Sequence, residues 1–531
     1  MNVHKLGIRK SNQLTTTSHM EIFSIFPSWL LTTILVLFCI FLYTLKSNSS
    51  SMVALKLPPN PPKLPIIGNM HQLLGQPRHL AFWKLSQEYG PIMLLNIGSK
   101  SCLIISSSTM AKQVFKDQDH ILCSRPISKT TKRLTYNYVD AAFSPHSNHS
   151  KKMRKVLVSE FMGPKRARVS NHVLLTEVEI MLRSVSLHPS NSAINLNELF
   201  LALVKALICK VAFGSSYREQ PLKGPSLEVM LDEVMELMNP FLGDFFPWFG
   251  PIFDQISGRN HKLEKLFSNL DAYIQTYIDE HHNHIGQVYD EDKDFLHTLL
   301  ELSSTENASG DDRLTIGEIK SLIVDIFLGG IDTTFTTTVW AMSEIIRSPR
   351  VMQKVQSEIR NCAGRKQKID ETDVSKMTYL KMVVKETLRL HPPAALLLPH
   401  ESLSHCQVGG YDVLPETMVI INGWAIGRDP STWGKNAAEF YPERFENLDQ
   451  VEFRGGNYDM VPFGGGRRTC PAIKTAPATI EFIIANLLYW YDWKIPGGVK
   501  NEDLDMVEEG SLLITKKLPL CLIPTKHIWE G

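Results

Sequence analysis

The segment Phe463–Ala472 constrains the chain most, because it places a cysteine directly after a run of glycines and arginines. Residues with helical apolar spacing follow Cys470, and Pro471 suits the first position of a helix. Glycines let the preceding backbone turn tightly, while the amides of a helix start and nearby guanidinium groups stabilise negative sulfur. We therefore expect Cys470 to be a thiolate that can ligate a metal. By itself, a cysteine after a glycine-rich turn is more often a small buried residue.

The same segment resembles the cysteine loop of the cytochrome P450 family, in which Phe, Gly, Arg and Cys recur at the spacing of Phe463, Gly466, Arg468 and Cys470. The resemblance implies a mainly α fold with small β-sheets and a haem b group whose iron is ligated by Cys470. It also implies that Phe463, Gly466 and Arg468 help to bind the haem. A thiolate ligand pushes electron density onto iron and favours splitting of the O–O bond, which is the chemistry that the family uses.

A long, largely apolar helix is predicted over residues 315–348, about 50 Å at 1.5 Å per residue. Its middle, Gly329-Gly330-Ile331-Asp332-Thr333-Thr334, has glycines, an acid and hydroxyls where a buried helix favours Leu and Ala. Close helix packing and a capped carboxylate would explain this without a function. The segment is similar to the family's central-helix motif, which implies a widened turn for O₂. The same motif implies that Thr333 holds the bound oxygen and that Asp332 relays protons.

An i,i+3 ion pair is predicted between Glu386 and Arg389 on a helix over residues 379–391. Such pairs are common on helix surfaces and mean little alone. The family carries Glu-x-x-Arg at this place, locked to an arginine from a later Pro-Glu-Arg-Phe segment. The resemblance therefore implies that Glu386, Arg389 and Arg444 form a buried structural network that supports the haem loop and takes no part in catalysis.

Two departures from the family affect the groups that bind the haem propionates. The usual Trp-Arg pair is replaced by Ser150-Lys151, and Pro-Arg-Glu is replaced by Pro399-His400-Glu401. Lys151 still offers a cation, whereas His400 exchanges a permanent charge for one that titrates near neutrality. We expect both residues to remain haem contacts.

Further departures follow the cysteine itself. The glycine that is usual two residues later is Ala472, and Pro477 removes an amide inside the next helix, which should kink it. We expect haem to be held less firmly than in typical relatives, with Arg468 carrying more of the propionate charge.

An N-terminal membrane anchor is predicted over residues 22–45, which contain no charged residue and are long enough to cross a hydrocarbon core of about 30 Å. A signal peptide is the rival interpretation, but the apolar run is long and no clear cleavage site follows it. Residues 1–21 form an N-terminal extension. Translation from Met20 would leave the basic side downstream, so we regard residues 1–19 as an upstream extension that N-terminal sequencing of the native protein would test.

A linker and proline-rich hinge follows over residues 46–69, and the catalytic domain is expected over residues 70–531. Repeated prolines disfavour helix and make the segment a semi-rigid spacer between the anchor and the body. A ligand for proline-binding modules is the alternative.

The body is expected to be mainly helical, with few and short strand signals. A β-hairpin is predicted from Leu94 to Ser106 around Gly98-Ser99. Besides those already named, helical periodicity covers residues 110–116, 150–158, 173–185, 196–213, 227–239 and 258–281.

Composition excludes some classes of protein. The net charge of +1 argues against a general nucleic-acid binder. The 8 cysteines show no paired or regular spacing, which excludes a disulfide framework or a zinc site built from cysteines and fits a reducing compartment.

The substrate pocket implied by the resemblance is apolar. It should be lined by Gly329, Ala395, Leu396, Leu397 and Leu512, and by parts of residues 136–143. A rigid hydrophobic molecule with a terpenoid, steroid-like or alkaloid skeleton fits such a pocket better than a sugar or a charged acid.

Electrons must come from another protein, because no Rossmann or flavin fingerprint follows a predicted strand. The resemblance, finest to the microsomal plant A-type branch, implies NADPH–cytochrome P450 reductase, with NADPH used only through it. It also implies a single-pass protein of the endoplasmic reticulum membrane with a cytosolic catalytic domain. The candidate docking face comprises Lys151, Lys152, Arg154, Lys155, Arg467 and Lys474, although a merely solvated charge run is the alternative.

Three functions remain open on the residues alone. The first is a monooxygenase that inserts one oxygen atom from O₂. The second is a reductase-independent haem isomerase or dehydratase, which would not need the relay of Asp332 and Thr333. The third is a catalytically impaired relative, consistent with the losses on the propionate side.

Overall fold

The computed structural model describes residues 55–218, 224–282, 293–304, 313–446 and 458–529, together with Thr32, Thr33 and Val36. The chain divides into two compact units, residues 1–56 and 57–531. Most of the predicted anchor over residues 22–45 lies outside the described residues, and the following description concerns the second unit.

Helices make up most of this unit, as predicted, and several match the expected ranges closely. The predicted helix over residues 196–213 is α7 (Leu196–Phe213). The other helices are α2 (Arg78–Tyr89), α3 (Ser108–Lys112), α4 (Lys129–Leu134), α5 (Asn148–Val156), α6 (Pro164–Leu187), α8 (Leu227–Leu237), α9 (Leu242–Phe245), α10 (Gly250–Ile256), α11 (Arg259–His282), α12 (Phe295–Ser304), α13 (Ile316–Arg347), α14 (Pro349–Ala363), α15 (Glu371–Val374), α16 (Thr378–Leu390), α17 (Gly423–Ile426), α18 (Pro430–Trp433) and α19 (Thr475–Trp490).

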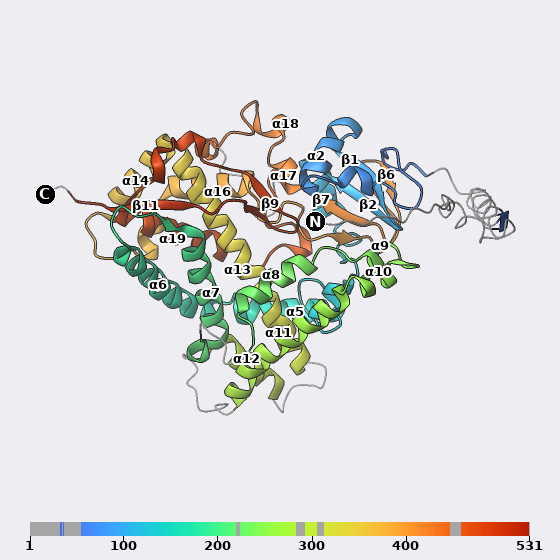
Figure 1. The fold of residues 1–531 in the computed structure, drawn as a ribbon, viewed down its shortest axis with the longest axis horizontal. Helices are drawn as coiled ribbons and strands as arrows, with labels where there is room; N and C mark the ends of the chain where they lie inside the picture. Colours follow the sequence, from blue (N-terminus) through green and yellow to red (C-terminus); the bar gives the residue numbers. More distant parts are fainter. Residues whose placement is uncertain are drawn as a thin grey trace, which may run out of the picture. The chain divides into compact units, whose positions relative to one another are not determined.

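The strands form small sheets, and those of the largest sheet lie at one side of the unit (Figure 1). β1 (Ile92–Ile97) and β2 (Lys100–Ile105) form the predicted hairpin. β7 (Met418–Ile421) pairs in parallel with β2, and β4 (His400–Glu401) pairs antiparallel with β7, which places His400 on this sheet. The remaining strands pair as β5 (Cys406–Val408) with β6 (Tyr411–Val413), β9 (Glu508–Gly510) with β10 (Ile514–Lys516), and β11 (Cys521–Lys526) with β3 (Ile194–Asn195) and β8 (Tyr491–Lys494).

α13 is the central element, and most of its side chains are buried. A capping box starts it: the Glu318 amide donates to Thr315 Oγ1 (3.2 Å), and the Thr315 amide donates to the Glu318 carboxylate (2.6 Å). α7 approaches closely at Gly330, where a Cβ would lie 2.9 Å from Ile208 Cδ1. The helix therefore begins and packs as its sequence predicts.

Among the described helices, residues 196–216 and 316–347 are long and apolar enough to cross a membrane. In their most apolar windows, 50% and 72% of the residues are buried inside the protein. Both are therefore core helices of this unit.

The proline-rich segment lies along β1. The Leu94 amide donates to Pro59 O (2.9 Å), and the Asn69 amide donates to Asn96 O (2.6 Å). The Asn69 side chain accepts a further bond from the Asn96 amide (2.8 Å). The compact unit accordingly begins at Leu57, before the end of the predicted hinge.

Three local expectations are corrected. α19 begins at Thr475, because residues 471–474 form a turn after Cys470. Pro477 is thus the third residue of α19, where an amide has no partner inside the helix, and α19 continues to Trp490. α13 is an ordinary α-helix across residues 329–334, without a widened turn.

Candidate active site

The loop before Cys470 packs so closely that only glycine fits it. Gly466 has φ of 63°, a conformation that glycine adopts readily. A Cβ at Gly466 would lie 2.2 Å from Asp119 Oδ1, and one at Gly465 would lie 2.6 Å from Cγ of Phe115. Gly466 therefore acts through the backbone conformation that positions Cys470.

Cys470 is partly exposed, on the wall of a cavity, and protein atoms cover most of the surroundings of its thiol. Burial raises its pKa above the usual range, and the Ala472 amide and the Arg154 guanidinium only partly oppose this effect. The expectation of a thiolate preformed by a helix start is therefore wrong, because α19 begins five residues later, at Thr475. A thiol in this setting loses its proton when it binds a metal cation.

Cys470 and the middle of α13 line the same cavity, which has a volume of about 750 Å³. Of the predicted site residues, the cavity is lined by Gly329, Thr333, Leu397, His400, Phe463, Arg468, Cys470 and Leu512. The chain thus brings together the sulfur, the hydroxyl and the apolar residues that the sequence placed in one site.

Two predicted pocket residues lie elsewhere. Ala395 is buried beside Trp424 and Ile514, and Leu396 packs against the core of the β1–β2 sheet. Leu397 lines the cavity, whereas the two residues before it point into other parts of the core.

On α13, Gly329 and Thr333 line the cavity, whereas Asp332 lies outside it. A Cβ at Gly329 would meet nothing within 4 Å. Thr333 Oγ1 donates to Gly329 O (2.7 Å), so the lone pairs of the hydroxyl oxygen stay available as acceptors. The burial of Asp332, assisted by the charge of Asp232 on α8, raises its pKa to about 6.

Three arginines line the cavity and donate to backbone carbonyls. Arg125 Nη1 donates to Leu398 O and Pro399 O, each at 2.8 Å. Arg468 Nε donates to Cys123 O at 2.9 Å, and Arg154 donates to Thr469 O. Carbonyls carry no full charge, so this end of the cavity favours a bound anion.

Nearby acids do not balance these cations fully. Asp140 and Asp325 form a buried pair, and burial raises the pKa of both carboxyl groups. Burial also lowers the pKa of Arg125 to about 9. Sequence reasoning missed Arg125, because it lies in an extended loop where no periodicity or motif marked it.

The expectation for Lys151 is corrected. Lys151 is exposed and does not line the cavity, whereas Arg154 on the same helix does. Successive residues of an α-helix are rotated by about 100°, so Lys151 points away from the face of buried Ser150.

The expectation that His400 titrates near neutrality is also corrected. Burial, assisted by the charges of Arg125 and Arg468, lowers the pKa of His400 to about 3. Its Nδ1 donates to Leu122 O (2.7 Å), and its ring meets Phe115 edge-on. His400 is therefore a neutral wall residue here, and the three arginines supply the positive charge.

A protein-family model described as "Cytochrome P450" matches residues 58–522. The chain belongs to the cytochrome P450 family. It is 52% identical over 512 residues to parthenolide synthase of Tanacetum parthenium, covering 96% of this chain and 100% of the relative. It is 44% identical to eupatolide synthase of Helianthus annuus (96% and 99% covered) and 36% identical to 2-methylbutanal oxime monooxygenase of Manihot esculenta (95% and 98%).

Solved structures support the fold. A zebrafish cytochrome P450 with progesterone has a TM-score of 0.71 at 23% identity, covering 85% of this chain and 100% of that one. Another with abiraterone has a TM-score of 0.70 at 23% identity, covering 85% and 99%. Like its P450 relatives, this chain is a haem-thiolate monooxygenase that uses O₂, a small substrate and a redox partner.

The cavity of this P450 fits a haem. A haem presents an iron that needs a thiolate and two carboxylates that need cations. Cys470 and the three arginines line the cavity, so the thiolate and the cations are present. The hydrogen bonds given above for these guanidinium groups all go to backbone carbonyls. The donor set therefore matches the group that the family carries.

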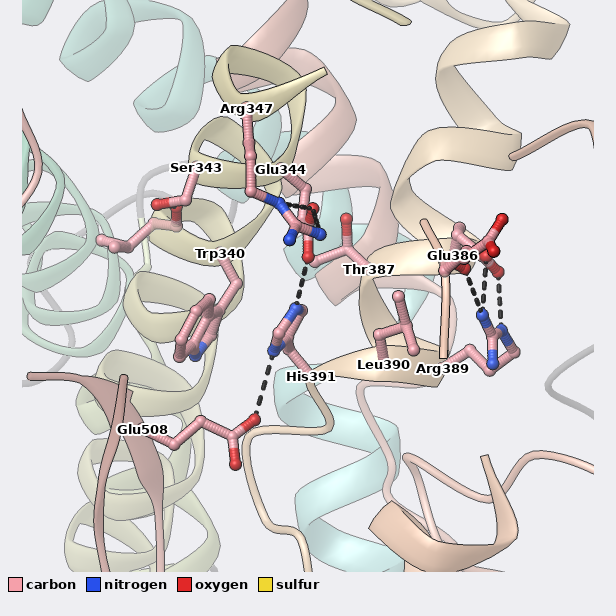
Figure 2. Close-up of polar contacts among 12 residues, drawn as sticks. Trp340, Ser343, Glu344, Arg347, Glu386, Thr387, Arg389, Leu390, His391 and Glu508 are labelled. Carbon is pink, nitrogen blue, oxygen red and sulfur yellow. Dashed lines mark hydrogen bonds and ion pairs between the residues drawn. The ribbon is translucent and has the colours of Figure 1, made fainter. Parts of the chain in front are cut away.

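A buried charge network joins α16 to the segment that carries Arg444. Figure 2 shows Glu386 and Arg389 joined by two hydrogen bonds, each of 2.7 Å. Arg444 Nε donates to the same carboxylate at 2.9 Å, as does the Tyr441 amide at 2.8 Å. Arg389 also donates to Ala437 O (2.6 Å). The structure thus brings the three predicted network residues together.

A second network, which sequence reasoning missed, lies nearby (Figure 2). His391 contacts Glu344 on α13 (2.8 Å) and Glu508 on β9 (3.4 Å), and Trp340 stacks on its ring at 4.1 Å. Trp340 Nε1 also donates to Ile514 O (3.1 Å). This network fixes the β9–β10 hairpin, whose turn carries Leu512, against α13.

We expect Glu386→Gln to lower the free energy of unfolding by about 3–5 kcal/mol, because two buried guanidinium groups lose their counter-charge. Urea unfolding of the haem-loaded protein would measure this. The control is Glu264→Gln, which breaks an exposed ion pair with Arg133 and should cost under about 1 kcal/mol. Equal losses in both variants would contradict the structural role of Glu386.

We expect Arg154→Met to weaken haem binding about 10–100-fold, the effect of losing one charged hydrogen bond of about 1.5–3 kcal/mol. Lys151→Met, on the same helix but exposed, should leave haem binding unchanged. Haem transfer to an excess of a haem-accepting apoprotein would measure both. The assignment of the two residues is wrong if Lys151→Met loses haem faster.

Proposed function

We propose that this chain oxygenates a hydrophobic terpenoid-type metabolite at the endoplasmic reticulum membrane, with electrons from NADPH–cytochrome P450 reductase. The observation that carries the proposal is one apolar cavity lined both by Cys470 and by the Gly329–Thr333 turn of α13. A haem bound there by Cys470, with Arg125, Arg154 and Arg468 on its carboxylates, supplies the oxidising chemistry.

Thr333 and Asp332 are proposed to deliver protons. The Thr333 hydroxyl donates to Gly329 O and keeps acceptor capacity toward the cavity. Asp332 has a pKa of about 6, raised by burial, and lies beside exposed Asp232. A carboxyl with a pKa close to neutral pH can both take and give a proton, as a relay requires.

A hydrophobic skeleton suits the cavity walls. Aliphatic and aromatic side chains form much of the cavity wall, although polar residues such as Asn171, Lys381 and Glu481 also line it. The apolar residues include Phe143, Val204, Leu207, Ile208, Leu512 and Leu513. Such walls bind a carbon skeleton through burial and leave orientation to a few polar groups. Similarity to parthenolide synthase and eupatolide synthase supports a terpenoid over an alkaloid or steroid-like substrate.

A basic face is proposed to bind the reductase. Lys151, Lys155 and Lys474 are exposed on the segments next to Cys470. Arg467 is exposed too, although it pairs with Asp119 at 2.7 Å. An acidic partner docked here would approach the cysteine side of the haem site. Arg154 leaves the predicted docking set, because it is only partly exposed and its guanidinium donates to Thr469 O.

An apolar surface is proposed to lie on the lipid bilayer in addition to the predicted anchor. Trp248, Ile252 and Ile256, in and just before α10, are 92%, 60% and 77% exposed. The β1–β2 turn links this region to exposed Ile66, since the amides of Gly98 and Ser99 donate to Ile67 O and Phe245 O. Exposed apolar clusters of this kind mark membrane or protein contacts.

For the relay, we expect Thr333→Ala and Asp332→Asn to lower product formed per NADPH by about 10²-fold or more, the usual contribution of a positioned proton donor. NADPH consumption should continue and yield hydrogen peroxide. Product and peroxide would be measured with reductase and a metabolite that perturbs the haem spectrum on binding. Thr333→Ser, which keeps the hydroxyl, is the control. A product that forms without NADPH and survives both changes would favour the isomerase or dehydratase alternative.

For the bilayer, we expect Trp248→Phe to reduce the fraction of tryptophan fluorescence that brominated lipids quench in vesicles. Trp493→Phe, which removes a buried ring, should leave that fraction unchanged. If Trp248→Phe leaves the fraction of fluorescence quenched by brominated lipids unchanged, this surface does not contact the bilayer.

A further inference from the structure

A compact group of ligand-type side chains lies outside the haem cavity, where α11 ends and α12 begins (Figure 1). It comprises His281, Asp294 and His297, whose donor atoms lie within 4.8 Å of one another. His281 and Asp294 are buried, and the His297 side chain is only 14% exposed. None of the three lines the haem cavity.

The tautomer of His281 follows from its backbone contact. His281 Nδ1 lies 2.7 Å from Tyr277 O, and a carbonyl only accepts, so Nδ1 carries a hydrogen. Nε2 lies 2.9 Å from Asp294 Oδ2. In a neutral ring that nitrogen would present a lone pair to a carboxylate. The contact therefore requires a positive charge between ring and oxygen, either a second proton or a metal ion.

His297 faces the same carboxylate oxygen. Its Nδ1 lies 2.9 Å from Asp294 Oδ2, but without hydrogen-bond geometry. Both ring nitrogens of His297 are buried and make no hydrogen bond within the described residues. A buried imidazole is costly to leave unsatisfied, so a ligand for this nitrogen is expected.

The two carboxylate oxygens of Asp294 have different partners. Oδ1 accepts from the His297 amide (2.9 Å) and so caps the start of α12. Oδ2 is left facing the two imidazoles. The nearby guanidinium of Arg166 donates to Lys293 O and Thr298 Oγ1 instead of to Asp294.

We propose that His281 Nε2, Asp294 Oδ2 and His297 Nδ1 bind a divalent zinc ion. Two imidazoles and one carboxylate are a common zinc set, with a fourth position left for water. Metal-ligating histidines usually donate their other nitrogen to a backbone carbonyl, as His281 does to Tyr277. Tetrahedral bonds of about 2.0–2.1 Å separate ligand atoms by about 3.3 Å. The two 2.9 Å contacts need to lengthen only slightly.

The ion would join two helices and lie close to the end of a third. α11 contributes His281 and α12 contributes His297, while Gly214, directly after α7, lies so close that a Cβ there would be 2.6 Å from Asp294 Oδ2. Binding to the folded state alone raises its stability by mass action. The proposed role is therefore structural and independent of the proposed substrate, reductase and membrane surface.

The test uses the full-length, haem-loaded protein, dialysed against micromolar zinc and then against metal-free buffer. Elemental analysis would give the ratio of zinc to haem iron, which we expect to be close to one. His281→Gln and His297→Ala should lower it about tenfold or more. His282→Ala, an exposed neighbour on α11, should not.

Thermal unfolding followed by haem absorbance provides a second measurement. Zinc should raise the midpoint of the wild-type protein and of His282→Ala, but not that of His297→Ala. Since the His297 side chain makes no hydrogen bond to described residues, this variant should fold and bind haem even if His281→Gln does not. The proposal is overturned if the wild-type protein holds no more zinc per haem iron than the buffer background, or if His297→Ala holds as much zinc as the wild type. In either case the contact between His281 and Asp294 is a pair with a protonated imidazole.

Discussion

The packing of α16 against the segment from Trp433 to Arg444 depends on one buried carboxylate. Glu386 accepts from Arg389 and Arg444, and both guanidinium groups reach further to backbone carbonyls between Trp433 and Glu439. Taking three charges out of water is unfavourable unless every donor is matched. The segment from Trp433 to Glu439 is therefore held in a conformation that supplies those carbonyls. The His391 network holds the β9–β10 hairpin, whose turn carries the cavity residue Leu512, against α13 (Figure 2).

Charge at the haem site is divided differently from what the family motifs imply. Lys151 faces solvent and His400 is neutral, whereas Arg125 and Arg154 join Arg468 in the cavity. The replacements seen in the sequence thus remove less positive charge than expected. Three guanidinium groups remain, and each donates to a backbone carbonyl. A guanidinium has five N–H donors, so it can bind a carboxylate and keep a bond to a carbonyl. The expectation of weakly held haem accordingly loses its main physical reason.

Sequence patterns predicted those features that depend on local periodicity or on a dense motif. α7 was predicted to the residue, and α13 to within one residue at each end, because burial and capping both act locally. The start of α19 was wrong, since Pro471 satisfies the local rule while the turn after Cys470 is set by packing. Ala395 and Leu396 were misplaced because the direction of a side chain in a loop has no period. Arg125 and His391 act through partners more than 40 residues away, and no spacing reveals such contacts.

α13 also explains how protons and substrate are kept apart. Gly329 and Thr333 are four residues apart and face the cavity together, whereas Asp332 is turned by about 100° toward α8 and its exposed Asp232. The proposed relay would therefore receive its protons from the α8 side and not through the apolar part of the cavity. In the proposed relay, a proton from the solvent near Asp232 would reach Asp332 first and the Thr333 hydroxyl second. A regular α-helix without a widened turn is sufficient for this arrangement, because the neighbouring residues Asp332 and Thr333 already lie on different faces of α13. Thr333 faces the cavity, and Asp332 does not.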